Sequence, residues 1–431
     1  LGENGTCSNC TAQGNTGRGI VADKSSPKLF ECHAVGNTGD GYVVGLGGSV
    51  RNCTSRNNGG NGFFPEIPDF PGGEGGRTLE GCVSEGNGLD GFVIRPGSTL
   101  IDCQAINNGC NGVHVTDNNV PAKTATTLLR GCVARSNSNM GFKIVIPPSG
   151  AAQVPTRDQG IATPAAPVAA MPLDVEKATA GASVRPARGP SLAMPLASVR
   201  FAGTGFGCVA EDNLGDGFYL DGEWSLSQCV SRNNGGVGIN SWSFGEAQTS
   251  SAEGNASDGF VFHGGYRMTD CTSRGNGGVG INSYSFGVGR GTVAEANTSD
   301  GFVLRGGYVL TECTARGNGG VGLHVTDNNS PAKGHGCVAE GNGLDGFIVT
   351  SGTLLTGCTA QGNGTTGVGS GIRVTGTGNR LEGNHLLSNY DWGISLFGGG
   401  NLVSGNTAAD NRVADYDIAA GNSYGPIVSA A

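Results

Sequence analysis

Five side chains suited to binding a sugar recur at one fixed spacing in the middle of the chain. The residue number rises by the same step from each member to the next: Asp221, Trp242, His263, Tyr284 and Arg305. We call this set the central stripe. Aromatic rings pack on the faces of sugar rings, and an Arg or a His holds a carboxylate or moves a proton. Three companions lie two positions before members of the stripe: Tyr219, Asn240 and Asn282. Together these residues form a candidate ligand-binding face, and a mixed exposed surface with scattered aromatic residues is the alternative interpretation.

The spacing of the stripe belongs to a repeat that runs through almost the whole chain. Cys recurs mostly with this same period or one position more, and Ser250, Thr292, Asn384 and Asn406 stand in its place where it is missing. A period near 21 with short alternating segments is typical of one coil of a parallel β-solenoid, in which each coil pairs with the next at about 4.8 Å. We therefore predict an all-β fold, a parallel β-helix of about sixteen coils.

An Asn follows at the fifth position after every one of these sixteen places, so the repeat predicts a stacked ladder of amides. Side chains at equivalent positions of a solenoid lie directly above one another, and inward Asn side chains then bond to each other along the stack. Apolar residues after a repeated Gly fill the narrow core, with Cys as a small buried apolar residue. The central members of the predicted Asn ladder are Asn213, Asn234, Asn255, Asn276, Asn297 and Asn318.

A second ladder explains why similar segments return at every second coil, as in CVSRNNGGVGIN and CTSRGNGGVGIN. Three positions after the Cys place, the charge alternates in sign along the chain: Glu211, Arg232, Glu253, Arg274, Glu295 and Arg316. Identical coils would bring like charges within about 4.8 Å of each other, which is destabilising. A two-coil repeat replaces that repulsion with exposed ion pairs, each contributing about 0.2–1 kcal/mol. We interpret this ladder as structural.

One long segment interrupts the repeat, because the step from Cys132 to Cys208 is more than three times the usual period. It is rich in Ala and Pro, and the register of the repeat continues on both sides of it. The expected organisation is therefore N-terminal coils over residues 1–146, an extended insertion over 147–205, and the same solenoid over 206–431.

The chain resembles right-handed parallel β-helix proteins of pectate-lyase-like topology. Its C-terminal part, GNRLEGNHLLSNYDWGISLFGGGNLVSGNTAADN followed by DYDIAAGNSYGPIV, looks like the end of uncharacterised secreted bacterial β-helix repeat proteins. The resemblance implies a right-handed coil and export, but no particular reaction. The catalytic patterns of the group are missing: the sequence has no Asp-Asp pair, no D-P-H-E stretch and no dense acidic calcium cluster beside an Arg or Lys. We therefore predict no catalytic residue.

Composition excludes several classes of partner. A formal charge of −9 argues against a nucleic-acid partner, and no apolar run is long enough to span a membrane.

Most Cys residues are expected to be free buried thiols, while Cys7 could pair with Cys10 or with another subunit. We predict no metal and no cofactor, because a lone C-x-x-C is a weak zinc signal.

Two acidic patterns receive a structural interpretation. From Asp216 to Asp300, an Asp precedes a Gly in every second coil; such residues would lie about 9.6 Å apart, too far to share a calcium ion, so Asp-Gly turns are expected. The segments GVHVTDNNVPAK and GLHVTDNNSPAK place a His three positions before an Asp, which duplication of a loop explains.

Three functions fit the sequence. The first is a non-catalytic extracellular scaffold whose coils stack head to tail into filaments, with the 147–205 arm contacting a neighbour. The second is a secreted or cell-surface protein that binds or cleaves a polysaccharide at the candidate face. The third is a trimeric cell-surface or phage adhesin. The first is the leading expectation.

Overall fold

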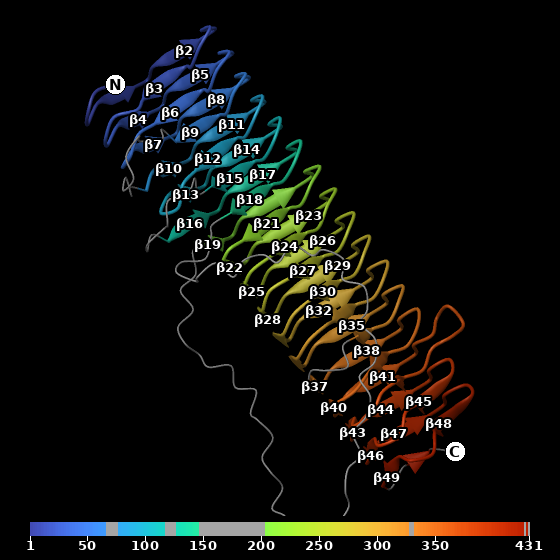
Figure 1. Ribbon diagram of the computed structural model, residues 1–431. Coiled ribbons are helices and arrows are strands. Elements are labelled where there is room, and N and C mark those ends of the chain that lie inside the picture. The colour runs from blue at the N-terminus through green and yellow to red at the C-terminus, as the bar shows by residue number, and fades with distance from the viewer. Residues whose placement is uncertain (66–75, 117–125, 146–202, 327–331, 426–427, 430–431) are drawn as a thin grey trace, which may run out of the picture. The chain divides into compact units, whose positions relative to one another are not determined.

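The structure is a computed structural model that describes residues 1–65, 76–116, 126–145, 203–326, 332–425 and 428–429. These residues form a β-solenoid in which each coil contributes one strand to each of three parallel sheets, as Figure 1 shows. Among them no helix is long and apolar enough to cross a membrane. The predicted insertion, residues 147–205, lies outside the described residues except for its last three.

The described strands of each sheet pair in parallel with their neighbours in adjacent coils. Sheet A has 17 described strands: β1 Thr6–Ser8, β4 Lys28–Phe30, β7 Ser49–Arg51, β10 Thr78–Glu80, β13 Thr99–Ile101, β16 Thr127–Arg130, β19 Gly203–Phe206, β22 Trp224–Ser227, β25 Gly245–Gln248, β28 Tyr266–Thr269, β31 Gly287–Arg290, β34 Tyr308–Thr311, β37 Ala332–His335, β40 Thr353–Thr356, β43 Arg380–Glu382, β46 Leu402–Ser404 and β49 Ser423–Tyr424.

Sheet B also has 17 described strands: β2 Thr11–Gln13, β5 His33–Val35, β8 Thr54–Arg56, β11 Val83–Glu85, β14 Gln104–Ile106, β17 Val133–Arg135, β20 Val209–Glu211, β23 Val230–Arg232, β26 Ser251–Glu253, β29 Thr272–Arg274, β32 Val293–Glu295, β35 Thr314–Arg316, β38 Val338–Glu340, β41 Thr359–Gln361, β44 His385–Leu387, β47 Thr407–Ala409 and β50 Val428–Ser429.

Sheet C has 16 described strands: β3 Ile20–Ala22, β6 Tyr42–Val44, β9 Phe63–Pro65, β12 Phe92–Ile94, β15 Val113–Thr116, β18 Phe142–Val145, β21 Phe218–Asp221, β24 Ile239–Ser241, β27 Phe260–Phe262, β30 Ile281–Ser283, β33 Phe302–Leu304, β36 Leu323–Val325, β39 Phe347–Val349, β42 Ile372–Val374, β45 Trp392–Leu396 and β48 Ala414–Ile418. The all-β parallel solenoid of about sixteen coils predicted from the repeat is confirmed.

The solenoid continues without a break in register from Val145 to Gly203. Strands β16, β17 and β18 pair directly with β19, β20 and β21. The solenoid resumes at Gly203, three positions before the boundary placed at residue 206. The strand was not recognised in the sequence because its inward positions, 203 and 205, are glycines and show no apolar alternation. Gly203 faces Trp224, and a Cβ at Gly203 would lie 2.2 Å from the Trp224 ring.

The Asn ladder predicted from the repeat is confirmed. The Asn213 side-chain amide donates to Oδ1 of Asn234 at 2.9 Å, and Asn234 donates in turn to Asn255 at 2.9 Å. Each Oδ1 also accepts the backbone N–H of the preceding ladder residue, as at Asn213 (3.1 Å). Because these amides are buried, protein groups must satisfy them, and most of the partners lie in the coils above and below. The ladder therefore ties every coil to its neighbours.

The repeated Gly nine positions after the Cys place has a different role from the glycines at the corners between strands. The positive-φ corners lie just before the Cys and Asn places, and Gly fills many of them, as at Gly81 and Gly86 (φ 60° and 64°), while Asn fills others, as at Asn52 (φ 52°). Gly41, at the repeated position, is needed for close approach: a Cβ there would lie 2.1 Å from Ser55 Oγ. A side chain at position 41 would overlap the next coil, so the position requires Gly.

Packing in sheet A gives the two-coil repeat a second cause besides charge. One inward column alternates large and absent side chains along successive strands: Trp224, Gly245, Tyr266, Gly287 and Tyr308. The three rings are buried, and a Cβ at Gly287 would lie 1.9 Å from Tyr266 Cε1. A ring in every coil would not fit, so large and small residues alternate with a period of two coils.

The charged column lies at the ends of the sheet B strands and pairs unevenly. Glu211 lies between two arginines, Arg135 at 2.7 Å and Arg232 at 3.1 Å. Bonds from Arg232 outweigh the effect of burial and, with Arg135, lower the pKa of Glu211. Glu295 likewise lies between Arg274 and Arg316, at 3.9 and 2.7 Å. Among the described residues, no ion pair within 4.0 Å involves Glu253. The column thus forms triads of two arginines around one glutamate.

Candidate functional site

The central stripe lies along the outer side of sheet C, where each member ends or directly follows a strand. Backbone bonds fix the spacing: Trp242 N donates to Leu220 O, His263 N to Ser241 O and Tyr284 N to Phe262 O, each at 2.8 Å. Inward neighbours such as Leu220 and Phe262 are buried in the core. The strand alternation therefore holds successive stripe residues one above another on an outward column.

Three rings of the stripe stack on each other. The ring centroids of Trp242 and His263 are 3.9 Å apart with planes at 16°, and those of His263 and Tyr284 are 5.0 Å apart at 9°. The Arg305 guanidinium lies over the Tyr284 ring, with Cζ 4.2 Å from its centroid. Trp242 and Tyr284 nevertheless remain 49% and 48% exposed. The four side chains make a continuous aromatic and cationic column, which we call the ring stack.

Because the rings stack on each other, few ring faces remain available to a ligand. We expected aromatic faces to be available for sugar rings, but the faces inside the ring stack are occupied by each other. Only the outer face of Trp242 is left, and it meets Tyr219 at a centroid distance of 6.5 Å and a tilt of 43°. Beyond this face, the stack presents ring edges and polar tips to solvent.

Arg305 joins the stripe to its companion column. Its Nη1 donates to Asn282 Oδ1 at 2.7 Å. Asn282 Nδ2 in turn donates to Asp258 Oδ2 at 2.8 Å. Among the described residues, no carboxylate forms an ion pair with Arg305 within 4.0 Å. The guanidinium is thus held in place by Asn282 and Tyr284, with no carboxylate paired to it among the described residues.

The recurring Asp residues are more than turn residues, because each fastens one coil to the next. Asp216 Oδ1 accepts the Val237 backbone N–H at 2.8 Å, and its Oδ2 accepts Asn240 Nδ2 at 2.9 Å. Asp258 repeats this arrangement with Val279 and Asn282. Asn240 Oδ1 is buried without a hydrogen-bond partner, whereas the equivalent atom of Asn282 receives Arg305.

Two His–Asp pairs on sheet C were missed from the sequence. His114 Nδ1 lies 2.9 Å from Asp90 Oδ2, and His324 Nδ1 lies 3.0 Å from Asp300 Oδ2. We had compared each His with the Asp three positions after it, and those Asp residues lie outside the described part of the chain. The signal is an Asp eight positions after the Cys place with a His at the outward position of the next coil, which only coil stacking makes adjacent.

Burial and hydrogen bonds shift the pKa values of three side chains on sheet C and its corners. Burial between the rings lowers the pKa of His263. Burial, followed by the charges of Asp221 and Asp216, raises the pKa of Tyr219. At Asp90, burial alone would raise the pKa, but hydrogen bonds from His114 and Asn111 outweigh it and lower the pKa. Near neutral pH both shifts favour the neutral forms of His263 and Tyr219.

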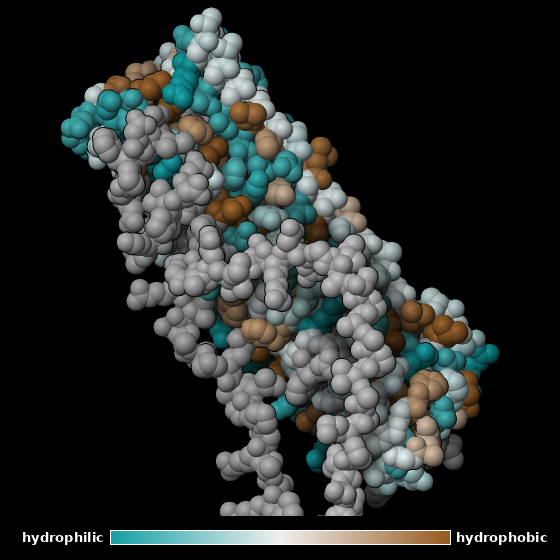
Figure 2. Space-filling view, viewed as in Figure 1, coloured by the Kyte–Doolittle hydropathy of each residue, from teal (hydrophilic) through white to brown (hydrophobic). Residues whose placement is uncertain are grey.

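This geometry is suited to holding a ligand. The ring stack supplies apolar edges, Arg305 supplies a cation, and Asp221 supplies a carboxylate. In the part of the chain that the structure describes, the one group of three or more His, Cys, Asp or Glu side chains close enough to hold a metal ion is made of cysteines and lies outside this face. Figure 2 shows hydrophobic and hydrophilic residues alternating in short patches on the coloured surface, with no continuous apolar band.

Comparison with known proteins shows similarity only among solved structures, because no family model and no curated protein matches the sequence. The A-module of mannuronan C-5 epimerase AlgE6 from Azotobacter vinelandii is 13% identical, with 99% of this chain and 91% of that chain covered and a TM-score of 0.27. A double mutant of the periplasmic alginate epimerase AlgG is 11% identical over 84% and 75%, with a TM-score of 0.38. The Siphovirus 9NA tailspike receptor binding domain is 11% identical over 99% and 72%, with a TM-score of 0.27. At these values the likeness assigns no function to the residues described above.

Proposed function

We propose that the protein binds a polysaccharide on the outer face of sheet C and holds it without chemical change. The observation that carries the proposal is the ring stack, which keeps two large aromatic side chains about half exposed beside a guanidinium free of carboxylates. Exposed Trp and Tyr residues with an adjacent Arg are the side chains that dominate binding surfaces. A secreted or cell-surface location is part of the same proposal.

The two ends of the ring stack suit different parts of a glycan. At one end, Trp242 is about half exposed beside Tyr219 and Asp221, so a sugar ring can pack against it while its hydroxyls bond the carboxylate. At the other end, Arg305 suits the carboxylate of a uronic acid. The net charge of −9 opposes an anionic chain, so this attraction is confined to Arg305.

Preorganisation strengthens the proposal. The guanidinium of Arg305 is already aligned by Asn282 and Tyr284, and His263 is held between two rings. Side chains fixed before binding lose little conformational entropy when a ligand arrives. The stripe also follows the stacking direction, so an extended glycan lying across successive coils contacts it at several points.

Calorimetric titration with a polyuronate and a neutral glucan tests the proposal. We expect Trp242→Ala to weaken the binding of both glycans at least tenfold, about 1.4 kcal/mol, because a half-exposed aromatic ring is lost. Arg305→Ala should weaken the polyuronate several-fold and leave the glucan nearly unchanged. Added salt should likewise weaken only the polyuronate.

Leu214→Ala is the matched control, since Leu214 is a large side chain, 72% exposed, that belongs to none of the strands of sheet C. Its affinities should equal those of the unaltered protein. Failure of either glycan to bind, or equal losses in the control and in Trp242→Ala, would reject the sheet C face as the site.

The filament, arm-contact and trimeric adhesin hypotheses stay predictions. Sedimentation velocity over a hundredfold range of concentration distinguishes them, because filaments grow with concentration, a trimer sediments as one species, and a monomeric glycan-binding protein does neither.

A further inference from the structure

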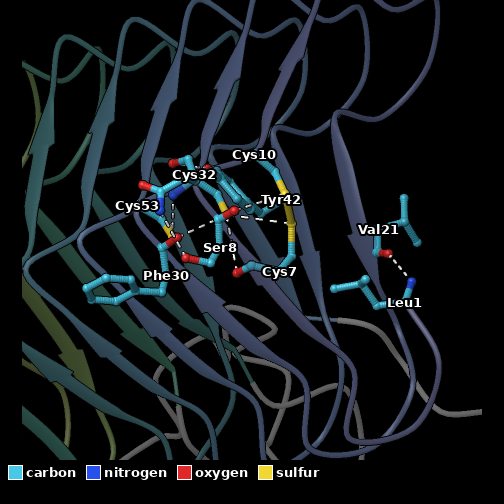
Figure 3. The surroundings of a disulfide bond; sticks show 10 residues. Leu1, Cys7, Ser8, Cys10, Val21, Phe30, Cys32, Tyr42 and Cys53 are labelled. Carbon is cyan, nitrogen blue, oxygen red and sulfur yellow. Dashed lines mark hydrogen bonds between the residues drawn. A yellow bond between two sulfur atoms is a disulfide. The ribbon is translucent and has the colours of Figure 1, made fainter.

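A cluster of three cysteines, shown in Figure 3, lies at the N-terminal end of the described solenoid. Several coils separate it from the ring stack. Cys7 lies in β1, Cys10 follows it, and Cys32 follows β4 in the next coil. Cys7 and Cys10 form a disulfide, and Cys32 Sγ lies 3.8 Å from Cys7 Sγ. All three sulfur atoms lie within 4.8 Å of one another.

The first coil carries one cysteine, Cys7, in addition to the Cys of the column. Elsewhere each coil contributes at most a single buried Cys to the column, and no other three sulfur atoms of the described residues all lie within 4.8 Å of one another. Cys7 stands at the inward position of sheet A that Leu29 and Val50 occupy in the following coils. A sulfur atom has replaced an aliphatic side chain where two further sulfurs are within reach.

The cluster is both accessible and held in place. Cys7 and Cys10 are partly exposed, whereas Cys32 is buried and closes the inner side. The Tyr42 hydroxyl donates to the Cys32 carbonyl oxygen at 2.5 Å and fixes that corner. An ion can therefore enter from solvent and meet a donor whose backbone is already positioned.

We propose that the reduced protein binds one soft closed-shell metal ion, of the class of Cu(I), Zn(II) and Cd(II), through the thiolates of Cys7, Cys10 and Cys32. Thiolate sulfur selects soft ions over Mg²⁺ and Ca²⁺. Sulfur ligands about 2.3 Å from one ion lie about 4 Å from each other. The 3.8 Å between Cys7 Sγ and Cys32 Sγ matches this value, so the two coils already have the spacing that the site needs. Cys7 and Cys10 reach it once their disulfide is opened.

The site exists only in the reduced state, because the disulfide uses two of its three donors. A water-soluble phosphine opens it: the disulfide takes up two electrons and two protons to give two thiols, and the phosphine takes an oxygen atom from water to become its oxide. Metal binding then releases the thiol protons. Loss of the metal on oxidation follows from the same geometry.

Titration of the phosphine-reduced full-length protein with Cd²⁺, followed by the ultraviolet sulfur-to-cadmium charge-transfer absorption, tests the proposal. We expect the absorption to saturate at one equivalent. The oxidised protein should show none of it, and this comparison requires no mutation.

The variants are chosen so that the fold accepts them. Cys32→Ser places at a ladder position the residue that Ser250 already provides, and Cys7→Leu copies Leu29. Each should weaken Cd²⁺ binding more than tenfold. Cys229→Ser, an identical change in a distant coil, should bind like the unaltered protein. Absence of the absorption in the reduced protein, its retention in either cluster variant, or an equal loss in Cys229→Ser would overturn the three-thiolate site.

Discussion

At the scale of single residues, His263 is the side chain whose surroundings differ most from what its type suggests. Its ring is packed between Trp242 and Tyr284, and burial lowers its pKa. The neutral imidazole is therefore favoured in the folded protein. His263 then contributes to binding as a flat ring and hydrogen-bonding edge, and a charged imidazolium is disfavoured at neutral pH.

The first prediction is a pKa of His263 below the ordinary value of about 6.5. The pKa of His263 is lower in the folded protein than in the unfolded chain. The contribution of the neutral imidazole to the free energy of unfolding is therefore complete above the unfolded-state pKa. It is lost as pH falls through that value toward the folded-state pKa, since the unfolded chain takes up the proton first. An NMR titration measures this pKa, with His263→Gln to assign the signal. Trp242→Ala should move the pKa back toward the ordinary value, and a pKa at or above that value in the intact protein would contradict the stacked arrangement.

Some contacts of the sheet C face could be predicted from the sequence, and others could not. The constant spacing was enough to place Trp242, His263 and Tyr284 in one column. It could not show that their faces would close on each other, because ring orientation depends on side-chain torsions. The pairs of His114 with Asp90 and His324 with Asp300 were missed because they join different coils, and local spacing does not reveal such contacts.

At the scale of elements, the strands of sheet A are specified by the fit between neighbouring coils. Gly245 and Gly287 leave room for Trp224, Tyr266 and Tyr308. The charge alternation predicted a two-coil repeat on the outside, and the buried rings require the same repeat on the inside. Charge signs can be read directly from the sequence, whereas the steric cause needs the register that places Gly287 against Tyr266.

The second prediction is that Gly287→Ala destabilises the protein by about 1–3 kcal/mol, the range for overpacking a filled core. The added Cβ would lie 1.9 Å from Tyr266 Cε1, so the ring or the strand must shift. Chemical denaturation measures the change in the free energy of unfolding. Gly17→Ala is the control, since a Cβ there meets nothing within 4 Å, and its effect should stay within about 0.5 kcal/mol. Equal stabilities of the two variants would show that the alternation is not steric.

At the scale of the whole molecule, the solenoid pairs across the interruption as it does everywhere else. The register of β18 with β21 and the Arg135–Glu211 pair both cross it. Repeat stability comes mainly from contacts between neighbouring coils, and both neighbours are present here. The sequence allowed this continuity to be predicted, because the Cys, Asn and charge positions keep their register on both sides.

The third prediction is that residues 146–202 are dispensable for folding. Replacing them with Gly-Glu, the pair that joins Asp221 to Trp224 in the next coil, restores the ordinary one-coil spacing between Cys132 and Cys208. The shortened protein should keep its β-sheet circular dichroism spectrum and its thermal midpoint within a few degrees. The prediction would be contradicted if the shortened protein failed to fold while a Gly-Glu connection between two other coils was tolerated. The solenoid would then need residues 146–202 in order to fold.

The most direct test of polysaccharide binding on sheet C is hydroxyl-radical footprinting of the full-length protein, with and without a saturating polyuronate, read by mass spectrometry. Trp242 and Tyr284 are exposed enough to be oxidised in the free protein, as are Leu214 and Tyr424 outside sheet C. We expect the polysaccharide to protect Trp242 and Tyr284 several-fold and to leave Leu214 and Tyr424 unchanged. Protection confined to Leu214 or Tyr424, or none at Trp242 and Tyr284 under saturating conditions, would contradict binding on sheet C.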